Sequence, residues 1–222
     1  MYLSHIAINK QLRKSRQALA FPQMMHAAVM GSFPPGLTDG SEEGKLRALW
    51  RIDYIDEQIW LYVLSKVKPD FKHIVEQFGW QGSEQLWETK EYNDFLDRLA
   101  IGQKWHFRLH ANPAHTVEGR ILPHVTAEHQ KKWLIGKAAK SGFAFDNIEI
   151  DGESYDTFDI VSRDIIKFKK LPTDKTYVTL TVVTFEGTLV VEDVETLREA
   201  LCVGVGRAKA YGCGLLTLAK QK

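Results

Sequence analysis

A short segment near the end of the chain, GVGRAKAYGCGLL beginning at Gly204, combines four glycines with two cationic residues. Glycine adopts positive φ readily, so Gly204, Gly206 and the two glycines beyond them can turn successive backbone N–H groups toward an anion. Arg207 and Lys209 add positive charge beside them. The segment lacks the G-x-x-x-x-G-K-[ST] pattern of a P-loop, and it follows a predicted helix, whereas a dinucleotide fingerprint follows a strand. It predicts a phosphate-binding loop, although a tight turn with glycines for backbone packing explains the same spacing equally well.

One histidine, His26, lies in the stretch FPQMMHAAVM, on a short helix that Pro22 is expected to begin. A histidine with an ordinary pKa of roughly 6.5 can accept or donate a proton near neutrality. Cutting an RNA phosphodiester with its own 2′-hydroxyl requires such a proton transfer. A surface or packing role on a mixed helix face is the alternative interpretation of this residue.

A basic run with interleaved apolar residues, FDIVSRDIIKFKK, begins at Phe158. Its cations are Arg163, Lys167, Lys169 and Lys170. A half-apolar, basic ribbon can lie along the phosphate backbone of an RNA stem. An edge strand that lysines protect from further pairing is an equally good structural explanation.

Metal-binding patterns are missing from the sequence. It has no HExxH, no CxxC and no tight acidic cluster. Its two cysteines, Cys202 and Cys213, are too few and wrongly spaced for a disulfide framework or a zinc ribbon, so we expect them to be packing residues in a reducing compartment. His106 and His110 lie four residues apart in a predicted strand, which separates them by about 13 Å, too far to share an ion. We therefore expect no metal site, no other cofactor and a metal-independent reaction.

The composition is that of a folded chain of 222 residues, with 44% hydrophobic and 26% charged residues. This length suits two domains better than one. The formal net charge of +1 gives no indication of nucleic-acid binding. Phosphate binding, however, depends on where the cationic residues cluster and not on the net charge of the chain. No apolar run approaches 18 residues and no signal peptide is recognisable, so we expect a cytoplasmic location without membrane association.

The first half of the sequence predicts a strand, two helices, a hairpin, a helix and a strand. Asn9 is the expected cap of the first helix and Asp70 that of the last. The expected ranges are strand 2–8, helices 10–20 and 22–30, a loop over 31–44, strands 46–53 and 58–66, helix 70–78 and strand 85–89. The order is βαββαβ.

The second half repeats this order. Thr126 and Asp193 are the expected caps of its helices. Its expected ranges are strand 104–111, helix 126–140, strands 143–150, 157–169 and 177–191, a helix through 194–204, and strand 215–219. The predicted fold is α+β, with two tandem ferredoxin-like, or RRM-like, βαββαβ domains over residues 1–99 and 103–222, the second carrying an inserted basic β-hairpin.

These pieces together resemble a known family. The stretches MYLSHIAIN, the proline-led helix with His26, FRLHANP, HQKKWLIGKAAKSGF, VTFEGTLVVED and GVGRAKAYGCGLLTLA are similar, in this order, to the CasE family of type I-E CRISPR repeat-processing endoribonucleases. The resemblance runs along nearly the whole chain.

The resemblance implies a metal-independent endoribonuclease that cleaves CRISPR precursor RNA at the base of the repeat stem-loop. It implies that His26 is the general acid or base, that the products carry a 2′,3′-cyclic phosphate and a 5′-hydroxyl, and that the protein keeps the mature guide RNA within the multiprotein Cascade complex. It implies no small-molecule cofactor.

The sequence departs from the family pattern around His26. Relatives can carry a tyrosine three residues before the histidine and a basic or hydroxyl residue soon after it, whereas Gln23, Ala27 and Gly31 stand near those places here. Ser32 is the candidate helper, and charge stabilisation of the transition state is expected from elsewhere. A non-catalytic RNA-binding subunit of the same fold is therefore the second hypothesis, and a ferredoxin-like module that binds a metabolite is the third.

Overall fold

The computed structural model describes residues 1–34, 48–80, 82, 87–169, 173 and 175–221. The chain forms two compact units. The first consists of Met1–Phe95 with Ala210–Gly212, and the second of Leu96–Lys209 with Cys213–Lys222. None of the helices in these ranges has the length and hydropathy to cross a membrane.

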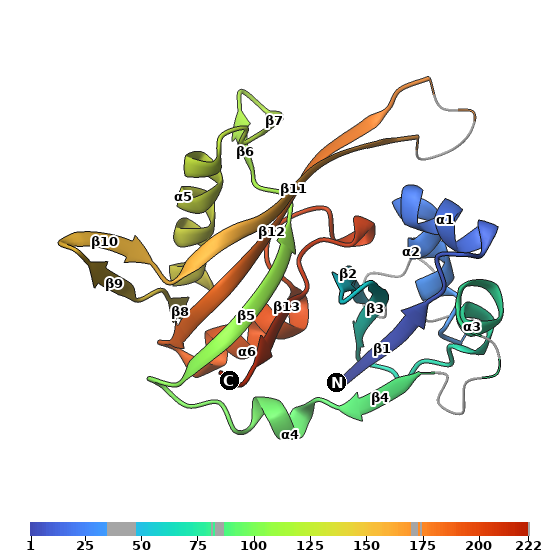
Figure 1. Ribbon diagram of the computed structural model, residues 1–222, viewed down its shortest axis with the longest axis horizontal. Coiled ribbons are helices and arrows are strands. Elements are labelled where there is room, and N and C mark those ends of the chain that lie inside the picture. Colours follow the sequence, from blue (N-terminus) through green and yellow to red (C-terminus); the bar gives the residue numbers. More distant parts are fainter. Residues whose placement is uncertain (35–47, 81, 83–86, 170–172, 174, 222) are drawn as a thin grey trace. The chain divides into compact units, whose positions relative to one another are not determined.

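The first unit has one antiparallel sheet with three helices (Figure 1). Its elements are β1 (Tyr2–Ile8), α1 (Arg13–Ala20), α2 (Pro22–Met30), β2 (Leu49–Ile55), β3 (Gln58–Ser65), α3 (Lys72–Phe78) and β4 (Glu88–Glu91). The strand order β2-β3-β1-β4 is that of a ferredoxin-like βαββαβ fold. The predicted fold of this half is confirmed.

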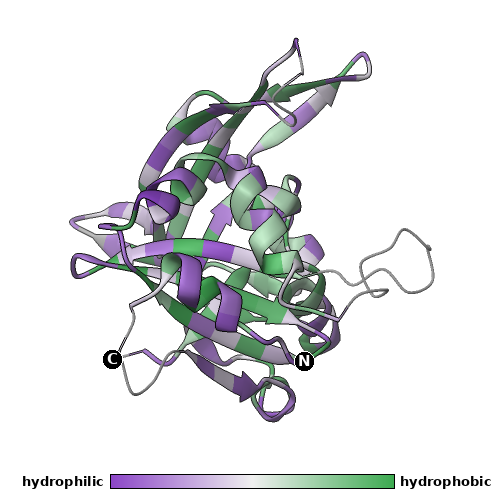
Figure 2. Cartoon of the chain, turned by 90° about the vertical axis from the view of Figure 1, so that its right-hand side faces the viewer, coloured by the Kyte–Doolittle hydropathy of each residue, from purple (hydrophilic) through white to green (hydrophobic). Residues whose placement is uncertain are grey.

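Apolar residues at alternate positions of the strands form the core of the first unit. Ile6 and Ile8 of β1 share a face with Leu61 and Val63 of β3, and all four are at most 1% exposed. Met25 and Val29, one turn apart on α2, belong to the same cluster. Figure 2 shows green, apolar positions running through the strands while hairpin ends are hydrophilic. Burial of this side of α2 fixes the helix on the sheet.

Local chemistry explains where some elements begin and end. Asp56 and Glu57 both have left-handed backbones, with φ of 47° and 64°, so a two-residue turn joins β2 to β3 and pairs Ile55 with Gln58. The prediction that Asn9 caps α1 is wrong. Its Oδ1 accepts a hydrogen bond from the Gln11 N–H in the preceding turn, and the helix begins only at Arg13. The predicted loop over 31–44 lies largely outside the described residues. Of the predicted strand over 85–89, residues 85 and 86 lie outside them, and the strand found there is β4, Glu88–Glu91.

The second unit contains a five-stranded sheet (Figure 1). Its elements are β5 (Lys104–Ala111), β6 (Ala114–Val117), β7 (Arg120–Pro123), α5 (Ala127–Ala138), β8 (Phe143–Ala144), β9 (Asn147–Ile150), β10 (Glu153–Asp156), β11 (Phe158–Phe168), β12 (Val178–Val191), α6 (Val194–Val203) and β13 (Leu216–Ala219); the short helix α4 (Asn93–Leu96) precedes them. The order β11-β12-β5-β13 repeats that of the first unit, with β8 paired to β12. Thr126 and Asp193 cap α5 and α6 as predicted, each accepting an N–H three residues on.

One feature of the predicted second domain needs correction. The basic run is not an insertion. It forms β11, an edge strand of the five-stranded sheet, which pairs with β12 as β2 pairs with β3 in the first unit. The insertions are two separate hairpins, β6–β7 and β9–β10. Their strands are four residues long and largely exposed, so they lack the apolar alternation that reveals a strand in sequence. For the same reason the predicted strand over 143–150 divides into β8 and β9, which belong to different sheets.

Candidate active site and nucleic-acid interface

His26 lies on α2 beside the helix surface that packs into the core. Pro22 occupies the first turn, where a missing N–H costs nothing, and Met25 and Val29 face the sheet. The ring of His26 is half-buried. Its Nδ1 is inaccessible to solvent and has no hydrogen-bond partner in the described part of the chain. A buried ring nitrogen without a partner is unusual in a native structure and requires an explanation.

Burial lowers the pKa of His26 below its ordinary value of 6.5, because desolvation disfavours the charged imidazolium. The ring is therefore neutral at pH 7. A neutral imidazole can accept a proton, which is the state that a general base needs.

The turn after α2 borders a hollow of about 420 Å³, whose lining includes Ser32, Lys68, Asp70 and His73. Ser32 is 4% exposed, and its hydroxyl donates to the Ala28 carbonyl over 3.3 Å. His73 donates from Nε2 to the same carbonyl over 2.9 Å. These two bonds satisfy the Ala28 carbonyl near the C-terminal end of α2. No hydrogen bond joins Ser32 to His26 in the described residues, so the predicted helper is engaged in the helix end.

Two of the predicted cations of the hairpin share one side of β11. Beyond the bulge at Ile160/Ser162, alternation places Arg163 and Lys167 on the same face. The ammonium groups of Lys167 and Lys169 lie 4.9 and 5.4 Å from the ring centroid of Tyr177. The aromatic ring thus gathers two positive charges at the far end of the hairpin. Lys170 lies outside the described residues.

The glycine-rich segment joins α6 to β13, and its backbone needs all four glycines. Their φ values are 85°, 84°, 80° and 91° for Gly204, Gly206, Gly212 and Gly214. At Gly206 a Cβ would also stand 3.1 Å from the ring of Trp133. The structural explanation of the glycines as a tight turn is therefore correct, and it does not exclude anion binding.

Part of this segment remains available to an anion. The N–H of Gly214 donates to the His110 carbonyl, whereas those of Gly206 and Arg207 have no backbone acceptor among the described residues. The Arg207 side chain is exposed and donates to Thr116 Oγ1 over 3.3 Å, and Lys209 is half-buried. Adjacent backbone N–H groups and a guanidinium are groups that can bind an anion.

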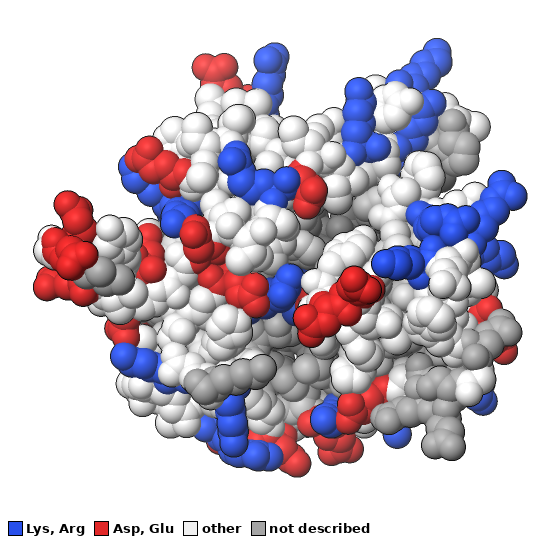
Figure 3. Space-filling view, viewed as in Figure 1, with Lys and Arg blue, Asp and Glu red and all other residues white. Residues whose placement is uncertain are grey.

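A basic face on α1 was not singled out from the sequence. Lys10, Arg13, Lys14 and Arg16 are exposed, and Figure 3 shows a blue cluster over α1. Arg16 Nη1 donates to the Gln11 carbonyl over 2.6 Å, which fixes its guanidinium at the start of the helix. The signal was present in the sequence as four cations without an acid in KQLRKSR. The α1 face adds a candidate phosphate-binding surface in the first unit.

Acidic residues gather elsewhere. The β9–β10 hairpin carries Glu149, Asp151, Glu153 and Asp156, all exposed, and forms the red cluster at the left of Figure 3. Such a surface repels phosphate. It explains how a chain with basic faces has a formal net charge of only +1.

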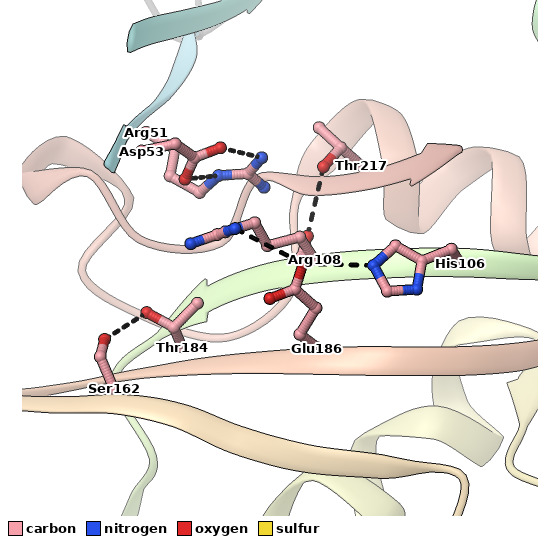
Figure 4. A network of polar contacts seen from close by, with 8 residues as sticks. All are labelled: Arg51, Asp53, His106, Arg108, Ser162, Thr184, Glu186 and Thr217. Carbon is pink, nitrogen blue, oxygen red and sulfur yellow. Dashed lines mark hydrogen bonds and ion pairs between the residues drawn. The ribbon is translucent and has the colours of Figure 1, made fainter. Parts of the chain in front are cut away.

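Two polar networks are structural (Figure 4). In the first unit Arg51 and Asp53 make two hydrogen bonds of 2.8 and 2.7 Å, and each side chain is 2% exposed. In the second unit Glu186 accepts from His106 and Arg108 across the paired strands β5 and β12, at 3.2 and 3.4 Å. Among the described residues, no three His, Cys, Asp or Glu side chains are arranged so that they could hold a metal ion.

The chain is similar to known proteins along nearly its whole length. The family model described as CRISPR associated protein matches residues 1–220. The curated relative named CRISPR-associated endoribonuclease Cse3, from Thermus thermophilus, is 28% identical over 99% of this chain and 100% of its own length.

Two solved structures share the fold. One is of CRISPR endoribonuclease Cse3 bound to a 19-nucleotide RNA, with a TM-score of 0.79, 28% identity, and 99% of this chain and 100% of that chain covered. The other, a chain of a CRISPR RNA-guided surveillance complex, has a TM-score of 0.61 and 20% identity over 100% of both chains, and it shows the fold alone. With a family model that spans nearly its whole length, this chain belongs to the family of CRISPR associated proteins, as its resemblance to CasE indicated.

Proposed function

We propose that this chain is a metal-independent endoribonuclease that binds the stem-loop of CRISPR precursor RNA and cleaves at its base. The observation that carries the proposal is the full-length family relationship together with His26, whose half-buried ring has an unpartnered Nδ1 on the proline-led helix α2. Relatives named as endoribonucleases cover the chain from end to end.

In the proposed reaction, His26 accepts the proton of the 2′-hydroxyl as the 2′-oxygen attacks the adjacent phosphorus. The bond from phosphorus to the 5′-oxygen breaks, and the leaving oxygen takes up one proton, from the His26 imidazolium or from solvent, so the number of protons is unchanged. The products are a 2′,3′-cyclic phosphate and a 5′-hydroxyl, so no water and no metal enters the balance. The lowered pKa of His26 keeps the base neutral at pH 7.

Binding is assigned to the cations that the sequence predicted. Arg163, Lys167, Lys169 and Lys170 of the hairpin are proposed to follow the phosphates of the stem. Gly204, Gly206, Arg207 and Lys209 are proposed to hold a further phosphate through N–H groups and charge. Ser32 has a lesser part, because its hydroxyl is committed to Ala28.

The partners follow from the same proposal. The mature guide RNA retains its stem after cleavage, so the protein is expected to stay bound to it within the Cascade complex. This assignment places the protein in the cytoplasm, where precursor RNA is made, and it requires no small-molecule cofactor.

A second candidate function is a non-catalytic RNA-binding subunit of the same fold. The observation that favours it is the surroundings of His26, where Gln23 and Ala27 replace groups that relatives can carry. One assay separates the two. A labelled repeat hairpin is mixed with the protein in EDTA, and the ends of any products are identified. Cleavage with a cyclic phosphate end supports the enzyme, whereas tight binding of intact RNA supports the second function.

A further inference from the structure

Three histidines of the second unit form one cluster on its surface. His115 lies on β6, His124 follows β7, and His129 lies in the first turn of α5. The ring centroids of His115 and His124 are 4.5 Å apart, and those of His124 and His129 are 6.0 Å apart. His115 and His129 are exposed and His124 is half-buried. The β6–β7 hairpin and the cap of α5 therefore bring together groups that are distant in sequence.

The three histidines lack a carboxylate partner among the described residues, unlike His5 and His106. His5 lies 3.1 Å from Glu88, and His106 lies 3.2 Å from Glu186. In the described residues, His115 and His124 contact rings, and His129 Nδ1 lies 2.9 Å from the Thr126 hydroxyl, but none of the three is paired with a carboxylate. Among the described residues, no paired carboxylate therefore compensates protonation of the cluster, and Glu128 acts on His129 through its charge without forming an ion pair.

Two arginines from other elements reach the same surface. Arg163 of β11 donates to the carbonyl of Val125, the neighbour of His124, and Arg207 of the glycine-rich segment donates to Thr116, the neighbour of His115. Both guanidinium groups bond neutral oxygens and have no carboxylate partner among the described residues. Two fixed positive charges thus accompany three titratable ones.

The remaining charges around the cluster do not neutralise it. Glu128 of α5 is engaged by Lys132 at 2.6 Å, and Lys131 is engaged by Asp159 at 2.9 Å. The turn of the β6–β7 hairpin contributes one charge of each sign, from Glu118 and Arg120.

We propose that His115, His124 and His129, with Arg163 and Arg207, form a proton-linked binding site for the phosphate backbone of RNA. The inference rests on the proposed function and extends the RNA-binding surface to the β6–β7 hairpin. A phosphate placed between the rings supplies the missing negative charge and favours the charged form of the histidines. Binding of RNA and uptake of protons therefore favour each other.

The pKa of His124 supports this arrangement. It is lowered from 6.5 by desolvation first, and then by the charges of His115 and His129. Without a ligand the rings resist simultaneous protonation. A polyanion removes that resistance, so the gain in affinity on acidification should be larger than for three isolated histidines.

The test compares equilibrium binding of a repeat hairpin at pH 6.0 and pH 7.5. The parent carries His26→Ala, which keeps the RNA intact and removes the titration of that ring. We expect the parent to bind roughly 10-fold more tightly at pH 6.0 at constant salt. The variant with His115→Gln, His124→Gln and His129→Gln should lose most of this gain, while the matched control His106→Gln, whose histidine is paired with Glu186, should keep it.

The number of protons taken up when RNA binds is a second, independent measurement, and it can be made on the parent with its histidine cluster intact. Calorimetric titration of RNA into the parent at pH 6.5, in two buffers of different ionisation enthalpy, should show uptake of about one proton or more, reduced in the triple variant. Equal uptake, or an equal affinity ratio in parent and triple variant, overturns the site and leaves the nuclease proposal intact. Absence of hairpin binding at both pH values overturns both. Thermal unfolding of each variant verifies that the fold is retained.

Discussion

The chemistry assigned to this protein rests on one side chain whose surroundings are informative. His26 has its Nδ1 buried without a hydrogen-bond partner among the described residues, in a helix that packing and a proline fix in place. A catalytic imidazole must be neutral before it can act as a base, and partial burial provides that state by lowering the pKa. The same burial holds the ring in a limited set of orientations.

The pH dependence of cleavage should reveal this environment. The parameter kcat/KM reports the free enzyme, so its acid limb should lie below pH 6.5, where the lowered pKa of His26 begins to protonate the base. In the RNA complex the negative charge of the phosphate raises the pKa of His26, so the acid limb of the single-turnover rate at saturating protein should lie at higher pH than that of kcat/KM. Single-turnover rates from pH 5 to 8 measure both. An acid limb of kcat/KM above pH 6.5 would contradict the assigned role of burial.

At the scale of single residues, the sequence identified which side chains could do chemistry, but it did not predict their contacts. His26 could be chosen because a proline-led helix and the motif order resemble a family, but its unpartnered nitrogen depends on packing. The engagement of Ser32 with Ala28 was equally invisible, since it depends on how the chain turns after α2. The three histidines at 115, 124 and 129 are brought together by a hairpin that the sequence did not reveal.

At the scale of elements, the β11–β12 hairpin should contribute affinity and not chemistry. Changing Lys167, Lys169 and Lys170 to Ala should weaken binding of the repeat hairpin and lower the slope of log K against log salt by about 1 for each lost phosphate contact. Lys90→Ala is the matched control, because Lys90 is exposed but pairs with Glu88 on β4. Fluorescence titrations at several salt concentrations measure the slope. An unchanged slope in the triple variant would assign this hairpin a purely structural role.

The glycine-rich segment should respond to substitution as a strained turn. Gly206→Ala introduces a side chain at φ 84° and 3.1 Å from Trp133, and it should lower the free energy of unfolding by about 1–2 kcal/mol. Gly136→Ala is the contrasting control. It lies on α5 with no atom near its added Cβ, so the change should stabilise the protein by about 0.5–1 kcal/mol. Urea unfolding of both variants checks the prediction, and equal effects of the two would argue against strain at Gly206.

Elements with clear alternation or a capping residue were predictable from sequence. The strands Tyr2–Ile8 and Lys104–Ala111 and the helix after Thr126 illustrate this. The β6–β7 and β9–β10 hairpins were missed because neither buries a face, and a strand without a buried face leaves no period in its sequence. The basic run was assigned to an insertion because its exposed cations obscured its place between core residues Phe158 and Phe168.

For the whole molecule, the order of elements was sufficient to give the topology. Each unit has the strand order of a ferredoxin-like fold, and the two orders correspond strand for strand. The charge distribution was not predictable from the net charge, since acids concentrated on β9–β10 offset cations on α1 and β11. The proposed boundaries, residues 1–99 and 103–222, remain a prediction.

Because the proposed contacts are to the stem, the protein should retain its product after cleavage. Cleavage at the base of the stem leaves the stem itself on the guide RNA, so the contacts from the basic surfaces persist and dissociation should be slow. With RNA in excess, product should accumulate rapidly to about one equivalent per protein and then nearly stop. A quench-flow time course followed by gel filtration measures this. Sustained multiple turnover with unbound guide RNA would contradict retention.

The central claim is that His26 carries the cleavage step. The most direct measurement is the single-turnover rate of cleavage of a labelled repeat hairpin in EDTA, for the unmodified protein and for His26→Ala, with hairpin affinity measured in parallel. The variant should lose detectable cleavage while its affinity changes by no more than about 3-fold, because the side chain lowers the barrier and adds little to ground-state binding. Undiminished cleavage by His26→Ala would contradict the account and move the chemistry to another residue.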